Sequence, residues 1–156
     1  MDPKEEIQKL LQTEMDNWTE YETKGENFRI SQKERFQPIR ILLKDLVSSI
    51  EPEYIETNIL DDHATIEVSN EMDCSSSIKW TIQPNFKVLE RNEEYWAINL
   101  WQNKINVEQA PGFKVEEKRG DGSDHLLEFG TDNELILYLA QKIAKRIAYY
   151  RYKKNR

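Results

Sequence analysis

The fold of this chain is decided by residues 53–83, EYIETNILDDHATIEVSNEMDCSSSIKWTIQ. Apolar and polar side chains alternate in three short runs, centred near Thr57, Ile66 and Trp80. An alternation with period two places successive side chains on opposite faces of a strand. The polar segment at residues 70–77 is typical of a loop. The stretch therefore predicts three strands of an antiparallel sheet that has one face in solvent.

The chain after this stretch extends the predicted sheet. Residues 95–107 form the richest alternating segment, and a turn is expected at residues 111–112, Pro-Gly, before the next strand. Residues 120–122, Gly-Asp-Gly, predict a hairpin turn that leads into a last strand at residues 126–129. Pro84 predicts a strand break, an edge or a bulge, because proline cannot donate to a sheet ladder. We expect an antiparallel meander of about five or six strands.

Two helices are predicted before the sheet. Each begins with a capping box, one at residues 2–5 and the other at residues 31–34, and each continues as an apolar stripe at helical spacing. Gly25 predicts the end of the first helix. Pro38 lies within the second pattern and predicts a kink there, or a main helix that starts at that residue.

A last helix is predicted after the sheet. Thr131 and Glu134 form its capping box, and its apolar residues recur at helical spacing. Helices gathered before and after a run of strands, without alternation, are typical of the α+β class. We predict a single domain over residues 1–156, with two N-terminal helices, the meander, and a C-terminal helix packed on the sheet. The apolar stripe of the last helix is Ile136, Leu139, Ala140, Ile143, Ala144, Ile147 and Tyr150.

Charge is distributed unevenly along the chain. The net charge is −7, yet residues 142–156 contain seven basic side chains and no acidic one. The other 141 residues carry 15 basic against 29 acidic side chains, a net of −14. An acidic body disfavours nucleic acid, whereas a basic terminal helix favours polyanions. Acidic residues concentrate in the N-terminal segment, which predicts a cationic partner, including the last helix of a second copy.

The last helix is the first candidate binding surface. Cations and aromatic rings interleave on one of its faces, a pattern that suits nucleic acid because cations neutralise phosphates and rings stack on bases. The simpler interpretations are that the cations complement the helix dipole, or that they pair with the acidic body of this molecule or of a second copy. We predict binding residues Lys142, Lys145, Arg146, Tyr149 and Lys153, and possible nucleic-acid contacts within residues 138–156.

Tyr95 and Trp101 form the second candidate surface. They share the face of a predicted strand opposite the row of Trp96 and Ile98. Exposed Tyr and Trp side chains are enriched in binding interfaces. The alternative, which we prefer, is that an N-terminal helix covers them and makes them a second core layer.

Catalytic and metal chemistry has weak support in the sequence. His63 follows two aspartates and His125 follows one, so a hydrolase or a metal-dependent enzyme near these histidines is an alternative. Their spacing matches no known motif, however, and both positions are predicted turns. The single cysteine, Cys74, argues against a disulfide-stapled domain and a thiolate zinc site. We expect no enzyme activity, cofactor or metal.

The leading hypothesis is an intracellular, non-enzymatic protein-interaction module or self-associating protein, such as a dimer, with an acidic body and a basic C-terminal helix. The alternative is a nucleic-acid-binding protein that uses that helix. With no apolar N-terminal run and no membrane-spanning stretch, we expect a cytoplasmic protein with no membrane partner.

Overall fold

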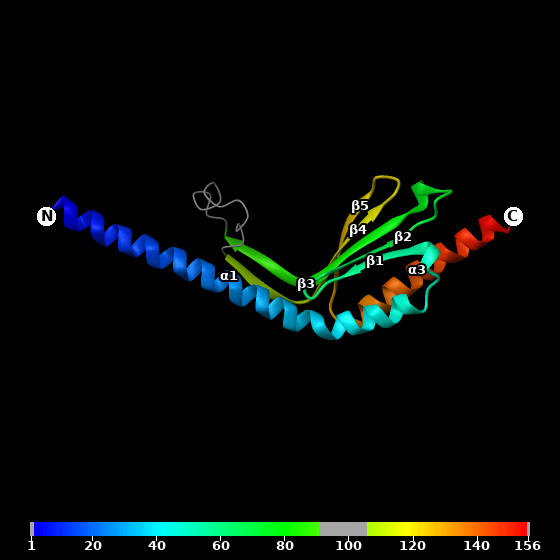
Figure 1. Ribbon diagram of the computed structural model, residues 1–156, viewed down its shortest axis with the longest axis horizontal. Helices are drawn as coiled ribbons and strands as arrows, with labels where there is room; N and C mark the ends of the chain where they lie inside the picture. The colour runs from blue at the N-terminus through cyan, green and yellow to red at the C-terminus, as the bar shows by residue number, and fades with distance from the viewer. Residues whose placement is uncertain (1, 91–105, 156) are drawn as a thin grey trace. The chain divides into compact units, whose positions relative to one another are not determined.

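The structure is a computed structural model that describes residues 2–90 and 106–155. It contains the helix α1 (Pro3–Ser48), the strands β1 (Ile55–Ile59), β2 (Ala64–Val68), β3 (Ile78–Glu90), β4 (Asn106–Arg119) and β5 (Asp124–Phe129), and the helix α3 (Asp132–Lys154). Two short 3-10 helices, η1 (Pro52–Tyr54) and η2 (Cys74–Ser76), precede β1 and β3. The α+β class is thus confirmed (Figure 1).

The described chain divides into two compact units. Among the described residues, the first unit comprises residues 2–31, 87–90 and 106–109, and the second comprises residues 32–86 and 110–155.

The two predicted N-terminal helices are one helix, so this prediction was wrong. α1 continues through Gly25 and through the capping box at Ser31 and Glu34. Gly25 costs helix stability but does not stop a helix, and Ser and Glu are compatible with a helix interior. Pro38 also lies inside α1, where it removes one hydrogen bond without ending the helix. Asp2 caps the helix as predicted, because its Oδ1 accepts from the Lys4 N–H at 3.0 Å.

The sheet is the predicted meander. In the described residues its five strands are ordered β1-β2-β3-β4-β5, the same as their order in the chain. Antiparallel register pairs Ile66 with Trp80 and Val115 with Leu127. The alternating burial along β2 follows from this register, because residues 64, 66 and 68 face the core while 65 and 67 do not.

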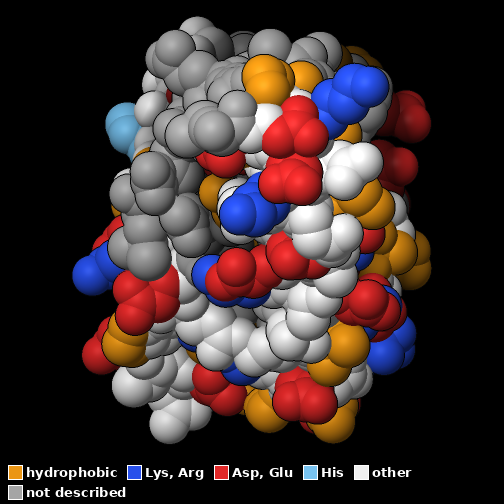
Figure 2. Space-filling model, turned by 90° about the vertical axis from the view of Figure 1, so that its left-hand side faces the viewer, with side chains coloured by type: hydrophobic (Ala, Val, Ile, Leu, Met, Phe, Trp, Pro, Cys, Tyr) orange, Lys and Arg blue, Asp and Glu red, His pale blue; other side chains and the backbone are white. Residues whose placement is uncertain are grey.

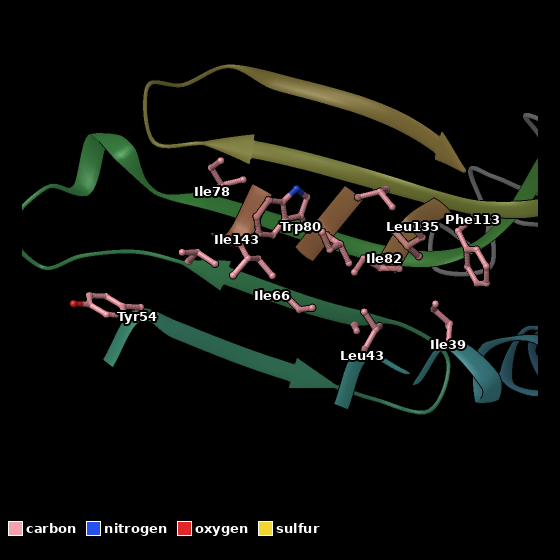
Figure 3. Packing of buried hydrophobic residues seen from close by; sticks show 14 of the residues in the cluster. Ile39, Leu43, Tyr54, Ile66, Ile78, Trp80, Ile82, Phe113, Leu135 and Ile143 are labelled. Carbon is pink, nitrogen blue, oxygen red and sulfur yellow. The ribbon is translucent and has the colours of Figure 1, made fainter. Parts of the chain in front are cut away.

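The core of the second unit lies on one face of this sheet. Residues of β2, β3 and β4 form one buried cluster with Phe36, Ile39 and Leu43 from α1 and with five residues of α3. The C-terminal part of α1 and α3 therefore cover the same sheet face (Figures 1 and 3). Trp80 lies at the centre of the cluster and is fully buried. The packing of the C-terminal helix on the sheet is as predicted.

Two prolines lie inside strands where a break and a turn were predicted. Pro84 is within β3, and Pro111 and Gly112 are within β4. Polar side chains satisfy the carbonyl groups beside these prolines. The Arg35 guanidinium donates to the carbonyl oxygens of Asn85 at 2.9 Å and Ala110 at 2.5 Å. Both strands thus continue past their prolines, with neighbouring carbonyl groups hydrogen-bonded by a side chain of α1.

Candidate interaction surface

The helix α3 is positioned by its first turn. The Thr131 side chain accepts from the Glu134 N–H at 3.2 Å, and the Glu134 carboxylate accepts from the Gly130 N–H at 3.1 Å. The Thr131 bond satisfies a donor that the helix N-terminus leaves unpaired, as the predicted capping box required. Glu134 accepts instead from the N–H of Gly130, one residue before the cap, and not from that of Thr131. The helix then buries one face in the core and leaves its other faces to solvent. The buried residues are Leu135, Leu139, Ile143, Ile147 and Tyr150.

Two adjacent tyrosines attach the C-terminal half of α3 to the loop before β3. The Tyr150 hydroxyl donates to the Ser76 carbonyl oxygen at 3.1 Å, and the Tyr149 hydroxyl donates to Asp73 Oδ2 at 3.3 Å. Burial raises the pKa of Tyr150, so this hydroxyl stays protonated at neutral pH. The hydrogen bond from Ser75 is the largest cause that lowers the pKa of Asp73, and the hydrogen bond from Tyr149 lowers it further. Tyr149 thus contacts the loop before β3 through its hydroxyl, while its side chain remains 38% exposed.

The cations of α3 separate into two groups. Arg151 pairs with Glu51, and Lys154 lies 4.0 Å from a Glu53 carboxylate oxygen. These two cations are thus balanced by acids of the segment that precedes β1. They do not contribute to an unpaired basic surface.

The second group forms the surface that the sequence predicted. Lys142, Lys145, Arg146, Tyr149 and Lys153 recur at helical spacing on one side of α3, and we name this set the basic flank. Within residues 2–90 and 106–155, no acidic side chain forms a salt bridge with its four cations. Its cations lie instead against rings, with Lys142 Nζ 5.6 Å from the centroid of the Tyr138 ring and Lys153 Nζ 5.7 Å from that of Tyr149. These distances are within the range of cation–π contacts, which keep a cation accessible to a further anion.

A buried carboxylate contacts Tyr138, one helical turn before the basic flank begins. Glu117 of β4 is 1% exposed and accepts three hydrogen bonds, from Trp80 Nε1 at 2.9 Å, from the Tyr138 hydroxyl at 2.5 Å and from an Arg119 nitrogen at 3.0 Å. The sheet register explains this position, because Phe113, Val115 and Glu117 alternate toward the core. Sequence reasoning missed Glu117. The available signal was an acid in phase with two buried residues and a buried tryptophan that needs an acceptor.

The protonation states of this group follow from its contacts. Burial raises the pKa of Glu117, but the hydrogen bonds from Tyr138, Trp80 and Arg119 together lower it below its ordinary value. Burial, and then the bond to Glu117, raises the pKa of Tyr138. Glu117 is therefore an anion and Tyr138 a neutral donor at neutral pH. This arrangement fixes the Tyr138 ring, against which Lys142 lies.

The first unit presents a surface of opposite charge. The segment Pro3–Ser31 of α1, together with the capping Asp2, carries eight acidic and four basic side chains, a net of −4, and we name it the acidic helix segment. Four aliphatic side chains recur on one of its faces and are each more than half exposed: Ile7, Leu10, Leu11 and Met15. Figure 2 looks at the side where α1 begins, and acidic and hydrophobic side chains lie next to one another there. An amphipathic face exposed to this degree is typical of an interaction surface.

The other predicted sites have different outcomes. Tyr95 and Trp101 lie outside the described residues. His63 precedes β2 and His125 lies on β5, and β3 and β4 separate these two strands, so the histidines do not form one site. His63 Nδ1 is 2.6 Å from Asp62 Oδ1 at the surface. No group of three or more metal-ligating side chains occurs within the part of the chain that the structure describes.

Comparisons with protein-family models, with curated proteins and with solved structures give no match for this chain. No helix among the described residues combines the length and the apolar composition needed to cross a bilayer.

Proposed function

We propose that this chain is a non-enzymatic protein-interaction module whose basic flank binds an acidic protein surface. The observation that carries the proposal is the separation of cations on α3. Arg151 and Lys154 pair with acids of the same chain, whereas the four cations of the basic flank have no such partner among the described residues. A set of unpaired cations on a fixed helix attracts an anionic surface at long range.

The aromatic rings indicate that packing, as well as charge, contributes to binding of the partner. The Tyr138 hydroxyl donates to the buried Glu117 at 2.5 Å, and the Tyr149 hydroxyl donates to Asp73 at 3.3 Å, so both rings are oriented by contacts within the chain. Oriented rings bind with a small loss of side-chain entropy. Tyr and Arg are also enriched among the residues that contribute most to protein interfaces.

The charge around the flank favours a protein partner over nucleic acid. Asp73 accepts a hydrogen bond from Tyr149 of the flank, and Glu51 and Glu53 form ion pairs with Arg151 and Lys154 of the same helix. Outside residues 142–156 the chain carries a net charge of −14, which repels an extended polyanion more than a localised acidic patch. Nucleic-acid binding is therefore the alternative outcome of the test below.

The test compares two double variants of α3. K145Q/K153Q removes two cations of the basic flank, and R151Q/K154Q removes the same charge from the paired group. A fluorescent poly-glutamate peptide is titrated into each protein at low salt, and anisotropy reports binding. We expect K145Q/K153Q to weaken binding at least about fivefold and R151Q/K154Q to weaken it by less than about twofold, since exposed pairs contribute little.

Two results would overturn the proposal. Equal effects of the two variants would mean that net charge alone governs binding. Tighter, flank-dependent binding of duplex DNA than of the peptide would replace the protein partner with nucleic acid.

A further inference from the structure

The chain itself carries a surface that matches the basic flank. The acidic helix segment is amphipathic, and acids flank its exposed aliphatic face at the two ends along the helix axis. Glu6 lies one turn before Leu10, and Glu22 lies two turns after Met15. Leu10 is 58% exposed and Met15 is 62% exposed.

We infer that the acidic helix segment of one copy docks on the basic flank of α3 of a second copy. This inference rests on the proposed function, for which it names the acidic partner. The contact joins two different surfaces, so it is heterologous, and a pair of copies retains one free acidic helix segment and one free basic flank for further copies. The assembly therefore grows head to tail.

Charge selects this occupant of the aliphatic face. Two acidic helix segments placed against each other would bring two net charges of −4 together. The basic flank instead offers four unpaired cations to one such segment. Like charges across an interface disfavour the first pairing, and opposite charges favour the second.

The shapes of the cationic side chains suit an aliphatic face. Lys and Arg have long aliphatic stems that cover apolar surface while the charged group reaches a carboxylate at the end of that surface. Tyr149, whose hydroxyl donates to Asp73, adds a ring to the same surface. The stems of Lys145 and Lys153 are then expected to cover Leu10 and Met15, with their charges directed outward to Glu6 and Glu22 at the two ends of the face.

Salt separates the two possible pairings of the aliphatic face. An acidic segment docked on a basic flank weakens as salt screens the attraction, whereas two acidic segments docked together are strengthened as salt screens their repulsion. Sedimentation velocity of the full chain over a range of concentrations, at low and high salt, measures this. We expect concentration-dependent assembly at low salt that weakens at least about tenfold at high salt.

Charge reversal tests the two surfaces separately. E6K/E22K reverses the charges at the two ends of the aliphatic face, and K145E/K153E reverses the basic flank. We expect either variant alone to assemble at least about tenfold more weakly, because like charges then meet. A chain that carries both sets of changes should assemble again, and an equimolar mixture of the two variants should form mixed complexes. E67K/K79E, which exchanges a cross-strand pair on the other face of the sheet, is the control and should assemble as the unchanged protein does.

The outcomes distinguish this inference from the proposed function. A protein that stays monomeric at every concentration and salt, yet binds poly-glutamate through the basic flank, would overturn the inference alone. Assembly that strengthens with salt, or that E6K/E22K increases, would also overturn it in favour of pairing between acidic segments. Failure of both assembly and peptide binding would overturn both proposals. Circular dichroism of each variant shows that a loss of assembly is not a loss of fold.

Discussion

Replacing Glu117 with Gln tests the buried carboxylate directly. The change keeps the size of the side chain and removes its charge. Gln offers one acceptor oxygen in place of two, so it can still accept from Trp80 Nε1. Trp80 and Tyr138 both donate to Oε1, so a Gln oxygen in that place keeps both bonds, as neutral ones. The amide nitrogen then takes the place of Oε2 and points a donor at the Arg119 guanidinium. We expect the fold to survive with a large loss of stability.

The contacts set the size of this loss. A hydrogen bond to a charged group contributes about 1.5–3 kcal/mol and a neutral one about 0.5–1.5 kcal/mol, so the bonds from Trp80 and Tyr138 each weaken by about 1 kcal/mol in E117Q. The pair with Arg119 contributes less, since the Arg119 side chain is 35% exposed and water screens it. Removal of a buried charge returns some solvation energy. We therefore expect E117Q to lower the free energy of unfolding by about 2–4 kcal/mol at neutral pH.

The same substitution predicts a dependence on pH. The folded-state pKa of Glu117 lies below its ordinary value of 4.5, so its contribution to stability is fully present above pH 4.5. That contribution is lost as the pH falls through the folded-state pKa. The difference in stability between the unchanged protein and E117Q should therefore be constant near neutrality and should narrow below pH 4.5.

Urea denaturation, followed by tryptophan fluorescence and by far-UV circular dichroism, measures the effect. E116Q is the matched control, because Glu116 is the neighbouring residue on the same strand and pairs only with the exposed Lys118, at 3.4 Å. We expect E116Q to change stability by less than about 0.5 kcal/mol. An E117Q protein as stable as E116Q would refute the reasoning, since the buried network would then contribute nothing.

Three further substitutions test other features of the fold by the same denaturation measurement. G112A should lower the free energy of unfolding by more than about 3 kcal/mol, because Gly112 has a φ of 82° and an added Cβ would lie 2.0 Å from the Phe129 carbonyl oxygen. G122A should lower it by about 1 kcal/mol, because Gly122 has a φ of 90° but open space around an added Cβ. Equal losses would show that the close approach at Gly112 is unimportant. G25A should stabilise α1 by about 0.5–1 kcal/mol, since nothing lies within 4 Å of the new Cβ, and a lower helix content would contradict this. R35M should cost about 2–4 kcal/mol by leaving carbonyl groups of β3 and β4 without donors; a neutral result would mean that water replaces the guanidinium.

Patterns with a short repeat were predictable from the sequence. The alternation around Ile66 and Trp80 identified β2 and β3, and the Gly-Asp-Gly turn at residues 120–122 identified the hairpin of β4 and β5. The box at Thr131 and Glu134 gave the start of α3. Each of these signals acts between residues close in the chain, so no tertiary contact was needed to interpret it.

The points at which a helix or a strand ends were not predictable in the same way. Gly25 was expected at the end of a helix and Pro111 in a turn between strands, yet each lies inside an element. Pro84, expected to mark a break, an edge or a bulge, lies inside β3 without breaking it. A proline ends a strand only if its missing donor is not compensated. Arg35 supplies donors to the neighbouring carbonyl groups from about 50 residues away in the chain.

The candidate surface shows the same division. The sequence by itself determined which residues of α3 share a side, because helical spacing fixes that geometry, and it also determined the opposite charges of the two ends of the chain. Only the tertiary structure decided which cations of α3 are already paired, since Glu51 and Glu53 reach them through the fold. It also placed Glu117 beneath Tyr138, because a buried charge is stable only where donors from separate elements meet it.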